Sequence, residues 1–130
     1  MSEKKKSLFK VNETGYHKSA KEILASWVNG VTEIKMKVND RIIFVPDVVV
    51  YKDGILDSIY EVVYTHPLTG WKYGKIQYYC YMNRCDLTVF EISADYILAQ
   101  TEKPDPIIPM ECYIVSMFEY EDELLLKSIS

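Results

Sequence analysis

The stretch of residues 41–66 constrains the fold most, because two acidic residues stand inside runs that are otherwise largely apolar. Asp47 lies in the first run and Glu61 in the second, and both runs have the composition of buried strands. Residues 52–54, which include an Asp-Gly pair, predict a tight turn between them. A carboxylate in a buried strand is costly unless it is paired or binds a metal. The two acids therefore indicate a functional site on a hairpin.

Whether the two acids share one face of this hairpin depends on the length of the turn. A three-residue turn at 52–54 makes Asp47 and Glu61 diagonal neighbours on the same face, close enough to share a cation. A two-residue turn puts them on opposite faces, and a bulge at Pro46 alters either count. Both arrangements stay open at the level of the sequence.

The 130 residues predict one domain, at 12–130, after a basic arm at 1–11 and with a C-terminal extension from about residue 104. The formal net charge of −4 argues against a general polyanion binder but leaves room for a local basic face. No leader-like or membrane-spanning apolar run is present, which favours a cytoplasmic protein, in a host cell if the source is viral. Three cysteines without framework spacing are expected to be free thiols.

Periodicity and turn residues predict an α/β chain. The first helix is expected to start near Asn12 or Thr14 and to end at Val28, before the stop signal Asn29-Gly30. We expect strands at 31–38, 41–51, 55–65, 87–92 and 111–118, and helices at 71–83 and 93–99. Residues 122–129 fit either a helix or a strand. The order is α-β-β-β-α-β with an extension.

Other polar residues have competing interpretations. Glu13, His17 and Lys21 recur at intervals of four, so they form one stripe on the first helix. The stripe is either solvated or turned toward the two acids. Lys72 and Lys75 lie on one side of the helix at 71–83, as phosphate contacts or as a solvated face. Three further side chains, at Tyr78, Tyr79 and Tyr81, either stack on bases or pack in the core. Glu91 alternates with apolar neighbours and is expected at the surface.

Carboxylates on neighbouring strands suit Mg²⁺ or Mn²⁺, because these ions prefer oxygen ligands and accept phosphate oxygens as further ligands. Strands also hold such ligands more rigidly than loops do. Asp47 and Glu61 meet this requirement. A lysine normally stands nearby in such sites, where it offsets charge on the phosphate.

These features together resemble the PD-(D/E)xK nuclease superfamily, and within it the competence-protein CoiA-like group of predicted nucleases. The resemblance covers roughly residues 12–99. It is carried by the order of elements and by short motifs that contain Glu13, His17, Lys21, Pro46-Asp47 and Glu61.

The resemblance implies a restriction-endonuclease-like fold, a mixed central sheet flanked by helices, and Mg²⁺-dependent cleavage of DNA. Asp47 and Glu61 would be the metal ligands, Glu13 an accessory ligand, and His17 a further catalytic residue. The motif has lysine two positions after the glutamate, where this chain has Val63. The candidates for a migrated lysine are Lys75 and Lys21, and His66 is a further residue that would line the site.

Two functions follow as hypotheses. The first is a metal-dependent endo- or exodeoxyribonuclease with Mg²⁺ or Mn²⁺ as cofactor. The alternative is a catalytically inactive relative that acts as a nucleic-acid-binding or protein-interaction module. DNA is the expected partner, a homodimer is an option, and no membrane is expected.

Overall fold

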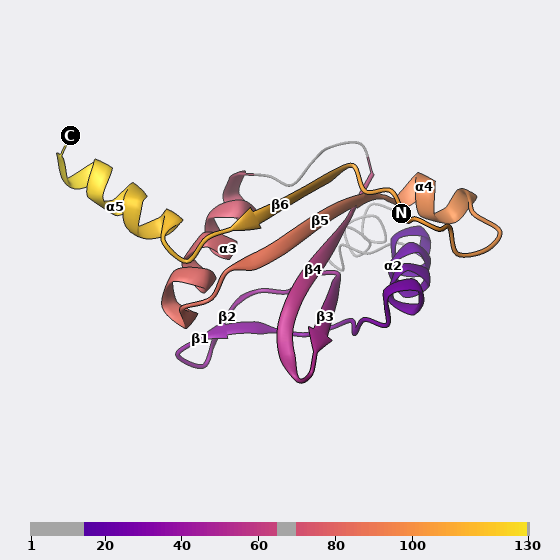
Figure 1. Cartoon of the computed structure of the whole chain (residues 1–130), viewed down its shortest axis with the longest axis horizontal. Helices are drawn as coiled ribbons and strands as arrows, with labels where there is room; N and C mark the ends of the chain where they lie inside the picture. The colour runs from indigo at the N-terminus through magenta and orange to yellow at the C-terminus, as the bar shows by residue number, and fades with distance from the viewer. Residues whose placement is uncertain (1–14, 65–69, 130) are drawn as a thin grey trace, which may run out of the picture.

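The computed structural model describes residues 15–64 and 70–129, which form a mixed α/β structure (Figure 1). The elements in chain order are α2 (Gly15–Val28), β1 (Met36–Val38), β2 (Arg41–Phe44), β3 (Val48–Lys52), β4 (Ile55–Val63), α3 (Gly70–Asn83), β5 (Leu87–Ser93), α4 (Ala94–Ala99), β6 (Glu111–Val115) and α5 (Glu119–Ile129). The predicted α/β class is confirmed at this level.

The main sheet has four strands in the order β3-β4-β5-β6. β4 and β5 run parallel, and the two outer pairs are antiparallel, so the predicted mixed sheet is confirmed. A parallel pair needs a crossover connection, and α3 lies within that connection. β1 and β2 form a separate two-stranded sheet.

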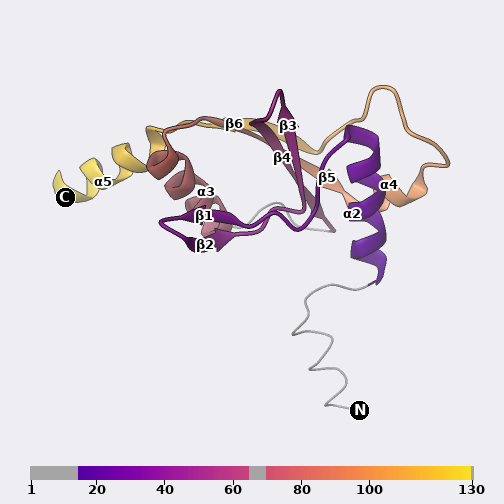
Figure 2. The ribbon, with the colours of Figure 1, turned by 90° about the horizontal axis from the view of Figure 1, so that it is seen from below.

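Helices cover both faces of the main sheet. On one face α2 and α4 pack against each other and against strand residues, in a core cluster that comprises Ala20, Leu24, Trp27, Val48, Val62, Ile92, Ala94 and Ile97. On the other face α3 and the β1–β2 hairpin enclose a second cluster, which comprises Met36, Phe44, Val49, Ile59, Ile76, Cys80, Leu87, Val89 and Val115. Helix α5 projects away from the rest of the molecule in both views (Figures 1 and 2).

Two strand predictions are wrong in part. The single strand expected at 41–51 is broken, because β2 and β3 belong to different sheets. Buried Pro46 stands at the break, where its missing N–H prevents a continuous ladder. Of the strand expected at 31–38, only β1 is regular, and Val31 instead forms an isolated bridge with Val49. Glu33 lies between these segments with a φ of 65°, which a strand does not tolerate.

Within the described residues the helix predictions are confirmed with small changes at the ends. The expected start of the first helix, near Asn12 or Thr14, lies outside the described residues. Asn29 has a left-handed φ of 55°, and the Gly30 amide donates to the Ala25 carbonyl at 2.8 Å, so the predicted stop of α2 is correct. The Ser93 hydroxyl caps α4 by accepting from the Tyr96 amide at 3.2 Å. The segment left open at 122–129 is helical, and β6 ends before the predicted residue 118.

Candidate functional site

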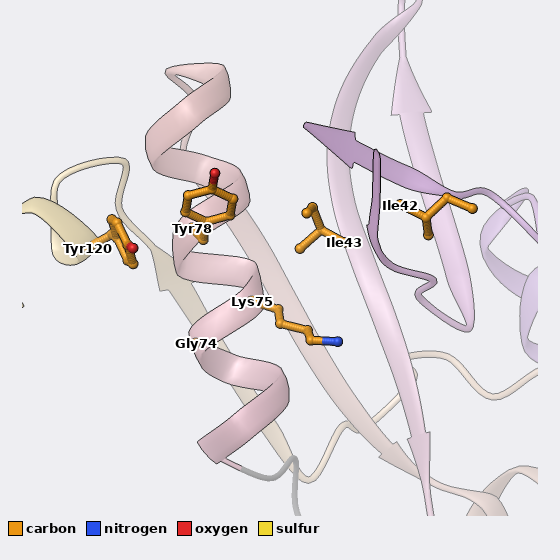
Figure 3. A pocket seen from close by; sticks show the side chains of 6 residues that line it. All are labelled: Ile42, Ile43, Gly74, Lys75, Tyr78 and Tyr120. Carbon is orange, nitrogen blue, oxygen red and sulfur yellow. The ribbon is translucent and has the colours of Figure 1, made fainter. Parts of the chain in front are cut away.

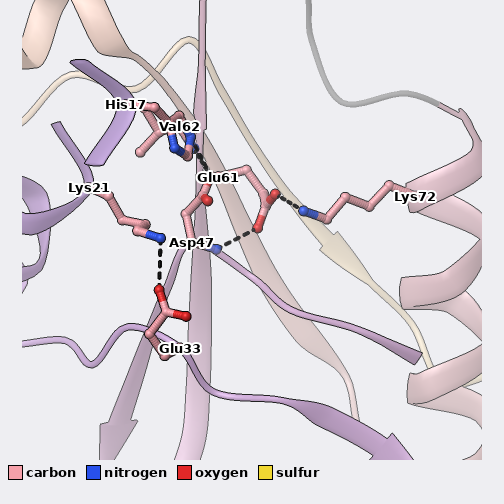
Figure 4. A network of polar contacts seen from close by, with 7 residues as sticks. All are labelled: His17, Lys21, Glu33, Asp47, Glu61, Val62 and Lys72. Atoms are coloured by element: carbon pink, nitrogen blue, oxygen red, sulfur yellow. Dashed lines mark hydrogen bonds and ion pairs between the residues drawn. The ribbon is translucent and has the colours of Figure 1, made fainter. Parts of the chain in front are cut away.

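Two hydrogen bonds from backbone amides fix the carboxylates of Asp47 and Glu61 next to each other (Figure 4). The Asp47 amide donates to Glu61 Oε2 at 3.1 Å. The amide of Val62, the residue after Glu61, donates to Asp47 Oδ2 at 2.8 Å. Each carboxylate is therefore fixed by the backbone beside the other acid. Bonds from backbone amides to carboxylates are charge-assisted, and they hold both side chains at the start of β3 and near the end of β4.

The register of the hairpin explains why the two acids meet. Lys52 pairs with Ile55, so the turn has only two residues, which alone would put the acids on opposite faces. The register then shifts, because Val50 pairs with Ser58 and leaves Asp57 as an extra residue in β4. The shift brings Asp47 level with Glu61. The bulge lies in β4 and not at Pro46, where the sequence suggested one.

Glu61 is the more buried of the two acids, with only 4% of its surface exposed. Its pKa is raised from 4.5 to about 7 in total. Burial is the largest cause and the charge of Asp47 adds to it, while the contacts with Lys72 and with the Asp47 amide oppose the rise. A cation next to Glu61 would offset the cost of burying the Glu61 charge and would reduce the repulsion between the Glu61 and Asp47 carboxylates. The pair therefore favours binding of a cation.

Lys72 supplies such a cation from the start of α3. Its ammonium group forms an ion pair and a hydrogen bond with Glu61 Oε1 (Figure 4). The sequence predicted Lys72 to be a phosphate contact or part of a solvated helix face, and it offered Lys75 and Lys21 as the migrated lysine. The position two residues after Glu61 is the buried Val63. The structure thus places a lysine at the acids, but from a different residue than those nominated.

His17 joins the site from the first turns of α2. Its Nε2 atom lies 3.6 Å from Asp47 Oδ2, at ion-pair distance when the ring is protonated. The ring also packs 5.6 Å from the ring of Tyr64, measured between centroids. The Val62 amide and the His17 ring both contact Oδ2 of Asp47, and the other oxygen, Oδ1, is left out of these two contacts.

Lys21 is one turn further along α2 and is buried. Its ammonium group donates to Glu33 Oε2 at 3.0 Å, in the loop before β1 (Figure 4). The simple solvated stripe considered for the first helix is therefore wrong for this residue. The pair joins α2 to the segment whose positive φ interrupts the expected first strand.

Glu91 is a second buried acid on the β strand next to Glu61, and the sequence interpretation missed its burial. The expectation of a surface position is wrong, since only 3% of Glu91 is exposed. Glu91 is the register partner of Glu61 in the parallel pair β4–β5, so both side chains leave the same face of the sheet. The Tyr113 hydroxyl donates to Glu91 Oε2 at 2.6 Å. Burial and this bond raise the pKa of Tyr113 above its ordinary value, and the charge of Glu61 contributes.

One signal in the sequence points to this burial. β5 has apolar residues on both of its faces, Val89 on one and Ile92 on the other, as expected for a strand covered on both sides. A glutamate in such a strand has no solvated face to occupy.

Lys75 lies on the same helix as Lys72 but lines a pocket (Figure 3). The pocket has a volume of about 520 Å³, which is within the range of small-molecule sites. Its walls come from β2, α3 and the start of α5, and are formed by Ile42, Ile43, Gly74, Lys75, Tyr78 and Tyr120. Tyr78 and Tyr120 also contact each other edge to face, with centroids 5.2 Å apart.

Two candidates, Glu13 and His66, lie outside the described residues. Within residues 15–64 and 70–129, no group of three His, Cys, Asp or Glu side chains is arranged to hold a metal ion. Asp47 and Glu61 nevertheless offer an oxygen-only donor set. Such a set fits Mg²⁺ or Mn²⁺, which bind proteins through as few as one or two carboxylates and otherwise keep water ligands.

No protein-family model, curated protein or solved structure is significantly similar to this chain. None of the helices in the described part of the chain combines the length and the apolar character that a membrane span requires.

Proposed function

We propose that this domain is a metal-dependent nuclease-like domain that hydrolyses DNA phosphodiester bonds, with the restriction-endonuclease-like arrangement of the PD-(D/E)xK superfamily. The observation that carries the proposal is the contact between Lys72 and Glu61, beside Asp47. Two acids on neighbouring strands and one lysine are the groups that this chemistry needs. Val63 occupies the position of the motif's lysine and carries no charge. Lys72 supports the proposal because its ammonium group could replace that lysine.

In this proposal Asp47 and Glu61 hold Mg²⁺ or Mn²⁺, with Glu13 as an accessory ligand. When bound, the ion neutralises charge on phosphate oxygens and lowers the pKa of a bound water. The Lys72 ammonium offsets the charge of the phosphate next to Glu61. His17 holds or releases a proton at Nε2, adjacent to Asp47 Oδ2.

In this proposal the nucleic-acid strand runs along the surface of α3. Lys72 and Lys75 are three positions apart, so they lie on neighbouring positions of one helix surface. Phosphate contacts at both lysines would align the strand with the acids. The pocket beside Lys75 would receive a base against the ring of Tyr78, because aromatic rings stack on every type of base.

A specific observation also favours the second candidate, a non-catalytic binding module. The Lys72 ammonium already neutralises Glu61 within the protein, as a bound cation would. The described residues also lack a three-ligand group. In that function the ion pair is structural, and the domain binds nucleic acid or a protein through other surfaces.

Replacing Lys72 separates the two candidates. We would compare wild type, K72M and the control K52M, since Lys52 is an exposed lysine 3.9 Å from Asp57. Nicking of supercoiled plasmid and calorimetric titration with Mn²⁺ would be measured for each. A nuclease predicts that K72M binds Mn²⁺ but cuts about 100-fold more slowly, as when one charge-stabilising group is removed. If the ion pair is structural, wild type should not nick the plasmid. Mn²⁺ should then bind only to K72M, because the Lys72 ammonium occupies Glu61 in wild type.

A further inference from the structure

Two cysteines meet at the C-terminal end of α3. The Cys85 amide donates to the Cys80 carbonyl at 3.1 Å, and Arg84 between them has a left-handed φ of 53°. This is the geometry of a Schellman motif, in which the side chains of the two bonded residues commonly pack together. Cys85 packs accordingly against the core cluster that contains Cys80. Both are free thiols.

The two thiols differ in environment. Cys80 is fully buried, whereas Cys85 is partly exposed. A hydrogen bond between the thiols lowers the pKa of Cys85 to about 7, against the opposing effects of burial and of Asp86. The same bond raises the pKa of Cys80. Near neutral pH Cys85 is therefore the partner with thiolate character, and a thiolate is the nucleophilic form.

The backbone already brings the two residues together. A disulfide requires Cα atoms within about 7 Å. A direct N–H···O=C bond between the same two residues holds their main chains close, and their side chains pack on one core cluster. Forming the bond therefore needs little movement of the chain.

We propose that Cys80 and Cys85 form a redox-modification site at which hydrogen peroxide converts the two thiols into an intramolecular disulfide. The Cys85 thiolate attacks one peroxide oxygen, the O–O bond breaks, and hydroxide leaves, which gives a sulfenic acid. The Cys80 thiol then attacks the Cys85 sulfur and the S–O bond breaks. Water leaves with the thiol proton. The two thiols lose two electrons in total, and the peroxide gains them.

The 130-residue chain with the exposed third cysteine replaced, C112S, is the test protein, because it contains only this pair of cysteines. It would be treated with one equivalent of hydrogen peroxide, and free thiols and intact mass would be measured before and after reduction. We expect both thiols to disappear together, with a mass loss of about 2 Da that a reductant reverses. A cross-linked peptide that contains both cysteines should appear on proteolysis.

A second variant tests the assigned roles without disturbing the buried thiol. In C85S/C112S we expect Cys80 to keep its thiol under the same treatment, because it is buried and has lost its nucleophilic partner. The proposal fails if Cys80 is oxidised equally fast in this variant. It also fails if C112S gains oxygen at Cys85 without cross-linking, or if the disulfide joins two chains on a non-reducing gel.

Discussion

Asp47 and Glu61 each hold the other's carboxylate through the backbone: the Asp47 amide reaches Glu61 at 3.1 Å, and the amide after Glu61 reaches Asp47 at 2.8 Å. The acids are thus part of the hairpin's structure as well as candidate ligands. A change at either acid is therefore expected to affect both stability and cation binding.

Replacing Asp47 with alanine should abolish Mn²⁺ binding in calorimetric titration. The variant also leaves the Val62 amide without its carboxylate, at a cost of about 1–3 kcal/mol of unfolding free energy. E102A is the control, because Glu102 is an exposed acid in the loop after α4. If D47A binds Mn²⁺ as tightly as E102A does, Asp47 is not the proposed ligand.

The pKa of Glu61 predicts how stability depends on pH. Because folding raises this pKa from 4.5 to about 7, the native state binds a proton in this range that the unfolded chain has released. The contribution of Glu61 is therefore greatest below pH 4.5 and is lost as pH rises through about 7. The full change is on the order of 3 kcal/mol.

Urea unfolding of wild type and E61Q at several pH values measures this contribution. The difference in unfolding free energy between the two proteins should shift in favour of E61Q as pH rises from 5 to 8. A difference that stays constant over this range would show that Glu61 titrates at its ordinary pKa.

The pocket beside Lys75 predicts that this lysine contributes to nucleic-acid binding. K75A should weaken binding of a labelled single-stranded oligonucleotide about fivefold, which corresponds to about 1 kcal/mol. K103A is the control, because Lys103 is an exposed lysine in a loop. Fluorescence anisotropy in the absence of divalent ions makes the measurement independent of metal binding. If both variants bind like wild type, the strand does not follow α3.

Replacing two glycines with alanine should change the unfolding free energy in opposite directions. A Cβ on Gly74 meets no atom within 4 Å, so G74A should stabilise α3 by about 1 kcal/mol through helix propensity. A Cβ on Gly30 would lie 2.4 Å from Val48 Cγ1 and 3.0 Å from the Val49 carbonyl oxygen, so G30A should destabilise by about 1–3 kcal/mol. Thermal unfolding of both variants measures these changes, and G30A tests the close approach of the segment after α2 to β3.

The burial of Glu91 predicts a cost for losing its phenol donor. Y113F removes the hydroxyl that donates to Glu91 at 2.6 Å and should lower the unfolding free energy by about 1–2 kcal/mol. Y51F, on an exposed tyrosine, should change it by less than about 0.5 kcal/mol. Denaturant unfolding of the two variants compares them, and equal unfolding free energies would show that the Tyr113–Glu91 hydrogen bond does not stabilise the fold.

The local pattern of the sequence was sufficient for much of the fold. Helical periodicity and a stop at Asn29-Gly30 predicted α2, and the short apolar run at 87–92 predicted β5. These features depend on contacts between residues close in sequence, which periodicity and capping encode. The same reasoning identified Asp47 and Glu61 as acids in buried strands, because such positions are costly for a carboxylate in any fold.

Only the tertiary structure decided which residues accompany these acids. The bulge at Asp57 sets the register, and a shift of one residue moves a side chain to the other face. Lys72 reaches Glu61 because α3 crosses over the sheet between two parallel strands, and Glu91 joins them because β5 lies inside the sheet. Residues distant in sequence meet only when the chain packs, and strand order and crossover are not encoded in any local pattern.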